Sequence, residues 1–231
     1  MNKKKYYSQK HIVKNYNHYR FGGKSGKFVN NKELSYFLDQ INKYKINKIL
    51  DVPCGTGRFI SQLGTKFKVT GVDTSPAMIN ICQSKFPQSK FTKANINKLP
   101  FENNYFDCVL SLRLFHHYPI KKIKPMIKEI MRVLKKNGII MFDTHNRSPK
   151  QLVKYFFPKS IQRVYLHQDK QISALSKRLE LKIIGKKKAF LLTPHVCRYL
   201  PLCMVKLLDR SEKSLPSYLH TRTFWILQKN D

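Results

Sequence analysis

Short apolar runs alternate along the chain with stretches in which apolar residues recur every three or four positions. The recurring positions predict helices at 31–42, 57–64, 75–86 and 120–136. The apolar runs predict buried strands that end at Asp51 or span 66–73, 90–96, 106–113 and 138–144. Strands and helices that alternate in this way form a parallel sheet covered by helices. The pattern therefore predicts an α/β, Rossmann-like doubly wound sheet, mostly parallel, with helices on both faces.

The pattern changes after Pro149, where it predicts helices at 168–181 and 195–209 and strands at 182–192 and 221–229. With these, we expect seven strands, the last antiparallel. The N-terminal residues 1–30 are polar and aromatic and precede one domain, 31–231. Within them, FGGKSGK (21–27) has the wrong spacing for a phosphate-binding P-loop. We interpret it as a flexible basic loop.

The chain is strongly basic: 45 Lys and Arg against 13 Asp and Glu give a net charge of +32. Such a charge attracts RNA or an anionic membrane surface. The five cysteines form no CxxC pair, which favours reduced thiols and a cytoplasmic protein. No apolar run has the length of a transmembrane helix, so we expect a cytoplasmic protein or one peripheral to a membrane. No feature indicates a specific protein partner.

Several polar residues and glycines follow the predicted strands, where open α/β sheets bind ligands. Asp51, Asp73 and Asp143 end strands, and the stretch DVPCGTGRF (51–59) forms the turn after the first one. Each acid could instead cap the helix that follows it. A carboxylate about 20 residues beyond a glycine turn can accept hydrogen bonds from both hydroxyls of a ribose.

The turn contains Gly55 and Gly57 but has Ile60 where a dinucleotide fingerprint has its third glycine. That glycine belongs to pyrophosphate binding, so its absence disfavours NAD. A nucleoside with a positive centre and no phosphate fits better, and we expect S-adenosylmethionine as the cofactor.

Four ordered motifs resemble those of the class I S-adenosylmethionine-dependent methyltransferases, in the group that includes the ubiquinone/menaquinone enzymes. They are ILDVPCGTGRF (49–59), VTGVDTSPAMI (69–79), FTKANINKLPFENNYFDCVLSLRLFHHY (91–118) and MRVLKKNGIIMFDT (131–144). The resemblance covers about 30–145 and departs from the family at Pro53, where the family has glycine. It implies a transferase with an N-terminal lid (1–30), a cofactor-binding core (45–145) and a substrate-side part (146–231).

The resemblance also implies the cofactor-binding residues. Asp51, Gly55 and Gly57 would line the methionine end, and Asp73 would hold the ribose. Thr74 and Met78 would lie near the adenosine, Asn95 and Ile96 would flank the adenine, Ser111 would face the sulfonium, and Arg20 of the lid would meet the cofactor carboxylate.

Methyl transfer requires placement and exclusion of water more than it requires a general base. His116 and His117, just after the fourth strand, are the candidate catalytic bases. They could equally be a packed and a solvated histidine. No further ligands at suitable spacing accompany them, so we predict no metal site.

The methyl acceptor is the least constrained prediction. The segment 195–220 mixes large apolar residues with Arg198, Lys206 and Arg210, which suggests a cover over a small apolar or lipid-like acceptor. A core helix with a basic outer face explains it as well. The alternative acceptor is RNA, which the basic surface would attract.

Overall fold

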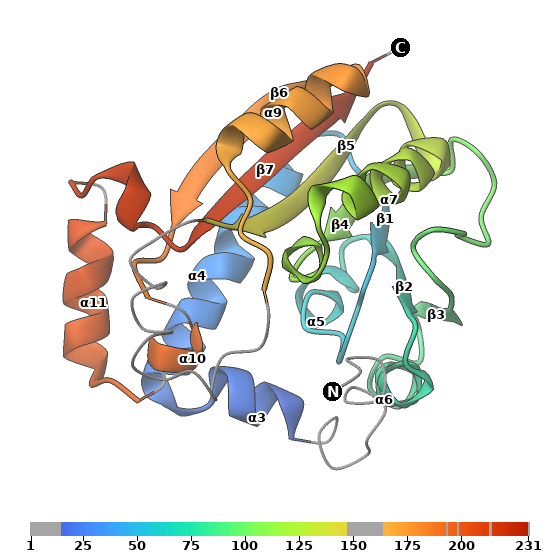
Figure 1. Cartoon of the computed structure of the whole chain (residues 1–231). Helices are drawn as coiled ribbons and strands as arrows, with labels where there is room; N and C mark the ends of the chain where they lie inside the picture. Colours follow the sequence, from blue (N-terminus) through green and yellow to red (C-terminus); the bar gives the residue numbers. More distant parts are fainter. Residues whose placement is uncertain (1–14, 147–163, 193, 198, 213, 231) are drawn as a thin grey trace.

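The computed structural model describes residues 15–146, 164–192, 194–197, 199–212 and 214–230. Within these residues, seven strands form one sheet in the order β3-β2-β1-β4-β5-β7-β6 (Figure 1). The β1–β2, β1–β4, β2–β3 and β4–β5 pairs are parallel, and β7 is antiparallel to β5 and β6. The predicted Rossmann-like fold class is confirmed.

The strands are β1 (Lys48–Asp51), β2 (Lys68–Asp73), β3 (Lys90–Lys93), β4 (Phe106–Ser111), β5 (Leu134–His145), β6 (Leu181–Ala189) and β7 (Arg222–Lys229). The helices are α3 (Tyr16–Phe21), α4 (Gly23–Asn42), α5 (Ile60–Leu63), α6 (Pro76–Lys85), α7 (Ile120–Val133), α9 (Asp169–Arg178), α10 (Pro194–Cys197) and α11 (Leu202–Ser211). Two 3-10 turns, η1 (Phe115–His117) and η2 (Ser217–Leu219), complete the described elements.

The sheet separates two apolar cores because successive strand residues point to opposite faces. Ile49 belongs to the core under α4, α5 and α6, whereas its neighbour Leu50 belongs to the core under α7 and α9. Phe224 and Trp225 of β7 divide in the same way. Figure 1 shows α7 and α9 on one face of the sheet and α4 on the other. Because both faces are covered, the central strands are apolar almost throughout.

The predicted loop at 21–27 is wrong, because Gly23–Asn42 is one helix that begins eight residues before the predicted position 31. Glycine allows the two N-terminal helices to approach closely: a Cβ on Gly26 would lie 2.7 Å from the carbonyl carbon of Phe21. Ser25 also donates to the carbonyl of Leu200 at 2.7 Å. Tertiary contacts therefore override the local loop signal. The division of the chain at residue 30 stays a prediction.

Two other predicted helices have different ends. The helix expected at 120–136 ends at Val133, and β5 begins at Leu134 with an irregular register against β4. Asn137 has φ of 59°, as expected for a left-handed residue, but it lies within β5. The helix expected at 195–209 is divided into α10, which ends at Cys197, and α11, which begins directly after Pro201; proline has no N–H to continue a helix through this position. In the described part of the chain, no helix is long and apolar enough to cross a membrane.

Candidate functional site

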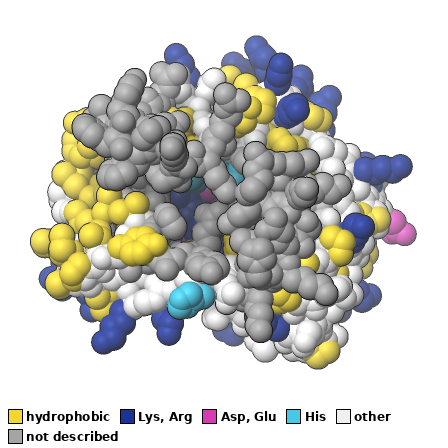
Figure 2. Space-filling view, turned by 60° about the horizontal axis from the view of Figure 1, so that its bottom comes forward, with side chains coloured by type: hydrophobic (Ala, Val, Ile, Leu, Met, Phe, Trp, Pro, Cys, Tyr) yellow, Lys and Arg dark blue, Asp and Glu magenta, His cyan; other side chains and the backbone are white. Residues whose placement is uncertain are grey.

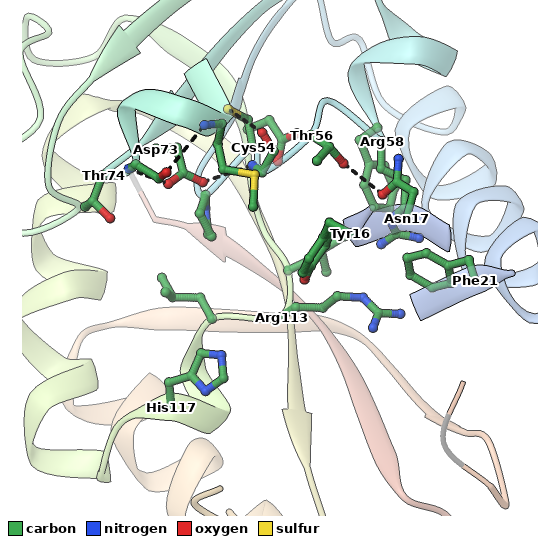
Figure 3. Close-up of a pocket in the computed structure, with 18 of the residues that line it drawn as sticks. Tyr16, Asn17, Phe21, Cys54, Thr56, Arg58, Asp73, Thr74, Arg113 and His117 are labelled. Carbon is green, nitrogen blue, oxygen red and sulfur yellow. Dashed lines mark hydrogen bonds between the residues drawn. The ribbon is translucent and has the colours of Figure 1, made fainter. Parts of the chain in front are cut away.

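A cavity of about 400 Å³ opens where β1, β2 and β4 end. That volume is within the usual range for a small-molecule site. In Figure 3, Asp73 and Thr74 lie on one side of the cavity, Arg58 and Phe21 on the other, and Tyr16 between them. Helix α3 lies against the glycine turn, where Thr56 donates to Asn17 at 2.8 Å. The strand-end polar residues and the N-terminal segment thus share one cavity.

The two glycines of the turn have different surroundings. Gly55 lines the cavity with φ of +54°, and a Cβ there would meet no atom within 4 Å. Gly57 has φ of +77°, and its Cβ would lie 2.5 Å from the ring of Phe86. Pro53, the departure from the family motif, follows a cis peptide bond and lines the cavity. Gly55 therefore leaves room for a ligand, whereas Gly57 permits packing against the residue that follows α6.

Asp73 organises the turn after β1. Its carboxylate accepts hydrogen bonds from the N–H groups of Gly55 at 3.0 Å and Ser75 at 2.9 Å. Burial raises the pKa of this carboxyl, and the N–H donors partly oppose that shift. Each carboxylate oxygen has a second lone pair, so a ribose hydroxyl can still donate to it.

Asp51 is an ionisable group of unusual pKa. Burial raises the pKa of its carboxyl to about 8, with a smaller contribution from Asp73, while Arg58 opposes the shift. A carboxyl with that pKa exchanges its proton near neutral pH, so a cationic ligand in the cavity can favour its charged form. Cys54, beside it, is a poor nucleophile because its hydrogen bond with Cys82 and its burial raise the pKa of its thiol.

Sequence reasoning missed a buried ionic network behind the cavity. Glu33 of α4 is fully buried and forms ion pairs with Arg58, Arg113 and Arg222. Burial alone would raise the pKa of Glu33, but the three guanidinium groups hold it well below its usual value. Arg58 and Arg113 line the cavity and flank the ring of Phe21. One feature of the sequence could have revealed the network. Glu33 lies four residues from both Val29 and Phe37, so this acid occupies the buried stripe of α4.

The structure brings six of the predicted cofactor residues to the cavity wall: Asp51, Gly55, Asp73, Thr74, Met78 and Asn95. Three others are buried and do not line it: Gly57, Ile96 and Ser111. Arg20 lies in α3, but its side chain is outside the described residues. Asp143 does not line the cavity. It belongs to the buried ionic network, in which it pairs with Arg222 at 2.8 Å.

The two candidate catalytic histidines have different positions. His117 lines the cavity, whereas His116 is buried and stacks on His145 with ring centroids 4.2 Å apart. Among the described residues, His116, Asp143 and His145 bring potential metal ligands within 4.8 Å of one another. Unlike Asp73, Asp143 forms an ion pair with the buried guanidinium of Arg222 at 2.8 Å, and this cation compensates the negative charge that a metal ion would need. We therefore assign no metal to this group.

The strand ends that form the cavity lie within a segment that matches a known protein family. Residues 49–138 match a model described as a methyltransferase domain. A Mycobacterium leprae phthiotriol/phenolphthiotriol dimycocerosates methyltransferase is 33% identical over 100 residues, which are 41% of this chain and 36% of that protein. A Campylobacter jejuni ubiquinone/menaquinone biosynthesis C-methyltransferase is 33% identical over 102 residues, which are 41% of this chain and 43% of that protein. The matches thus span less than half the length of these curated relatives.

Solved structures share the fold at low sequence identity. Magnesium protoporphyrin IX methyltransferase from Synechocystis has a TM-score of 0.67 and 13% identity, covering 98% of this chain and 97% of its own. A putative sarcosine dimethylglycine methyltransferase from Galdieria sulphuraria has a TM-score of 0.69 and 14% identity, covering 96% and 99%. Residues 49–138 thus match a methyltransferase domain, and the comparisons confirm the resemblance to the class I S-adenosylmethionine-dependent methyltransferases, and the cofactor, that the motifs predicted.

Proposed function

We propose that the chain binds S-adenosylmethionine in this cavity and transfers its methyl group to a small, apolar or lipid-like molecule. The observation that carries the proposal is the juxtaposition of Asp73 and Gly55. The strand-end carboxylate lies 3.0 Å from the N–H of the open glycine and lines the same cavity. A ribose bound by Asp73 would therefore place the rest of a nucleoside against the glycine turn.

The lining residues fit this cofactor by their chemistry. Gly55 leaves space that a side chain would fill, Asp73 offers acceptors for the ribose hydroxyls, and Asn95 offers an amide to the adenine. Asp51 offers a carboxyl that can ionise against a cationic amino group. When bound, S-adenosylmethionine supplies a methyl group on a positively charged sulfonium.

The rest of the cavity wall favours an apolar acceptor. Phe21, Leu112, Leu114 and Tyr118 line the cavity together with His117. These side chains would exclude water from the reacting groups and contact the apolar part of an acceptor, while the two arginines of the wall, Arg58 and Arg113, are paired with Glu33. His117 is placed to accept a proton from an acceptor that must lose one. The described wall supplies no other histidine for that role.

The names of relatives and neighbours support this class of acceptor. The Mycobacterium and Campylobacter relatives are named for dimycocerosates and for ubiquinone or menaquinone. A geranyl diphosphate methyltransferase, solved with geranyl diphosphate, has a TM-score of 0.63 and 13% identity, covering 86% of this chain and 78% of its own.

The test is a transfer assay with S-adenosylmethionine that carries a tritiated methyl group. The protein is incubated separately with a lipid extract and with total RNA, and the Asp73→Ala variant is the control. We expect label in the organic phase, strongly reduced in the variant. Label only in RNA would replace the proposed acceptor with the alternative one, and label in neither fraction would contradict the proposal.

A further inference from the structure

Helix α11 and its flanks expose large apolar side chains. Among the described residues, seven large hydrophobic side chains are exposed, and five of them lie between positions 196 and 218: Val196, Tyr199, Met204, Leu207 and Tyr218. Tyr199 is 70% exposed and Leu207 is 67% exposed. Single exposed apolar residues are ordinary, but a concentration in one segment marks an interaction surface.

The two sides of α11 differ in character. Its inner side buries Val205, and the acidic side chains Asp209 and Glu212 both pair with Lys32 of α4. The outer side consists of the exposed residues Cys203, Met204, Lys206, Leu207 and Arg210. These positions fall within one side of a helix, because residues three and four apart are neighbours. We call these five residues and Tyr199 the α11 patch.

The α11 patch is apolar and basic and contains no acid. Figure 2 shows hydrophobic side chains gathered at the left of one face, on the side where Figure 1 places α11. A hollow at the centre of the same face shows acidic, basic and histidine atoms. A ligand on the patch would therefore approach the face that carries this hollow.

We propose that the α11 patch docks on the surface of an anionic lipid bilayer. Apolar side chains with lysine and arginine beside them are the composition of helices that lie in a membrane interface. Methionine, leucine and tyrosine would enter the boundary between headgroups and acyl chains, while Lys206 and Arg210 would meet anionic headgroups. The long basic side chains can reach outward as the apolar ones insert.

Charge favours a bilayer over a second copy of the chain. The net charge of +32 makes two copies repel each other, whereas it draws each copy toward a negative surface. Docking requires neither cofactor nor acceptor. It goes beyond the proposed function and can be tested apart from it.

The test is co-sedimentation of the full chain with vesicles of phosphatidylcholine alone and of phosphatidylcholine with phosphatidylglycerol. We expect binding only to the anionic vesicles. The double variant Met204→Gln with Leu207→Gln should weaken it about tenfold or more, because two apolar side chains no longer leave water. Lys206→Gln with Arg210→Gln should weaken it about tenfold. Calorimetry with S-adenosylmethionine should give the same affinity for both variants as for the unmodified chain.

Matched controls lie elsewhere on the surface. Ile183→Gln changes an exposed apolar residue of β6, and Lys121→Gln with Lys122→Gln removes two exposed charges from α7. Both should bind vesicles as the unmodified chain does. Three results would overturn the proposal: no binding to anionic vesicles, equal weakening by the α7 variant, or a Met204 and Leu207 variant that changes only the oligomeric state in analytical ultracentrifugation.

Discussion

The guanidinium of Arg222, 1% exposed on β7, donates to the carboxylate of Glu33 on α4 at 2.9 Å, across 189 positions of sequence. Arg222 also pairs with Asp143 on the neighbouring strand, and Glu33 pairs with the cavity residues Arg58 and Arg113. These buried charges therefore connect α4, the strands β5 and β7, and the cavity wall.

Glu33→Gln should strongly destabilise the protein. The substitution leaves three guanidinium groups around a neutral amide, and breaking a buried ion pair on one side costs about 3–5 kcal/mol. Urea denaturation measures the change in the free energy of unfolding. Asp39→Asn, at an exposed position of the same helix, is the control and should change it little. Equal stability of Glu33→Gln and the unmodified protein would show that the network contributes nothing.

Stability should fall with rising pH because of Asp51. The pKa of its buried carboxyl is raised to about 8, so the folded protein keeps a proton that the unfolded chain releases near pH 4. Between these two values, each pH unit should cost about 1.4 kcal/mol relative to Asp51→Asn. Thermal unfolding of both proteins without cofactor, from pH 5 to 9, measures the difference. If the stability of the two proteins changed with pH in parallel, Asp51 would be ionised throughout this range and the prediction would be wrong.

Alanine at the two glycines of the turn should have opposite consequences. Gly55→Ala places a methyl group in open cavity space at a cost of about 1 kcal/mol of backbone strain, so folding should survive while cofactor affinity drops about tenfold or more. Gly57→Ala directs its methyl group into Phe86 and should destabilise the fold by about 1–3 kcal/mol. Thermal unfolding and cofactor titration of both variants separate the effects. The reverse pattern would place the ligand elsewhere.

His117→Gln should lower kcat about 100-fold with little effect on cofactor affinity, because a general base acts in the transition state. His145→Gln is the matched control, since His145 stacks on His116 but does not line the cavity. An unchanged kcat in His117→Gln would mean that methyl transfer needs no base from this position.

The central sheet could be predicted because parallel strands buried on both faces are continuous apolar runs. The positions of Asp51, Asp73 and Asn95 followed from strand ends and were found at the cavity. The first turns of α4 were missed because the glycines near Gly26 signal a loop locally, whereas Ser25 is held by the carbonyl of Leu200, 175 positions away. Local sequence could not show that contact.

The buried ionic network of Glu33 and Arg222 could not be predicted from local sequence either. Asp143 ends its strand as Asp51 does, but Arg222 reaches it from β7, which pairs beside β5 although it is the last strand in sequence. Sequence adjacency says nothing about which strand lies next to which in such a sheet. Ser111 was predicted to face the cofactor because it ends β4, but it is fully buried and does not line the cavity. Its place at a strand end did not show which way its side chain is enclosed.

Calorimetric titration with S-adenosylmethionine tests the proposed cofactor site most directly. The unmodified chain and Asp107→Asn, changed at an acid outside the cavity, should bind one cofactor per chain with equal affinity. Asp73→Ala should bind about 10- to 100-fold more weakly, because a charged acceptor of ribose hydrogen bonds is lost. The absence of binding by the folded, unmodified chain, or equal affinity in Asp73→Ala, would contradict the proposed site.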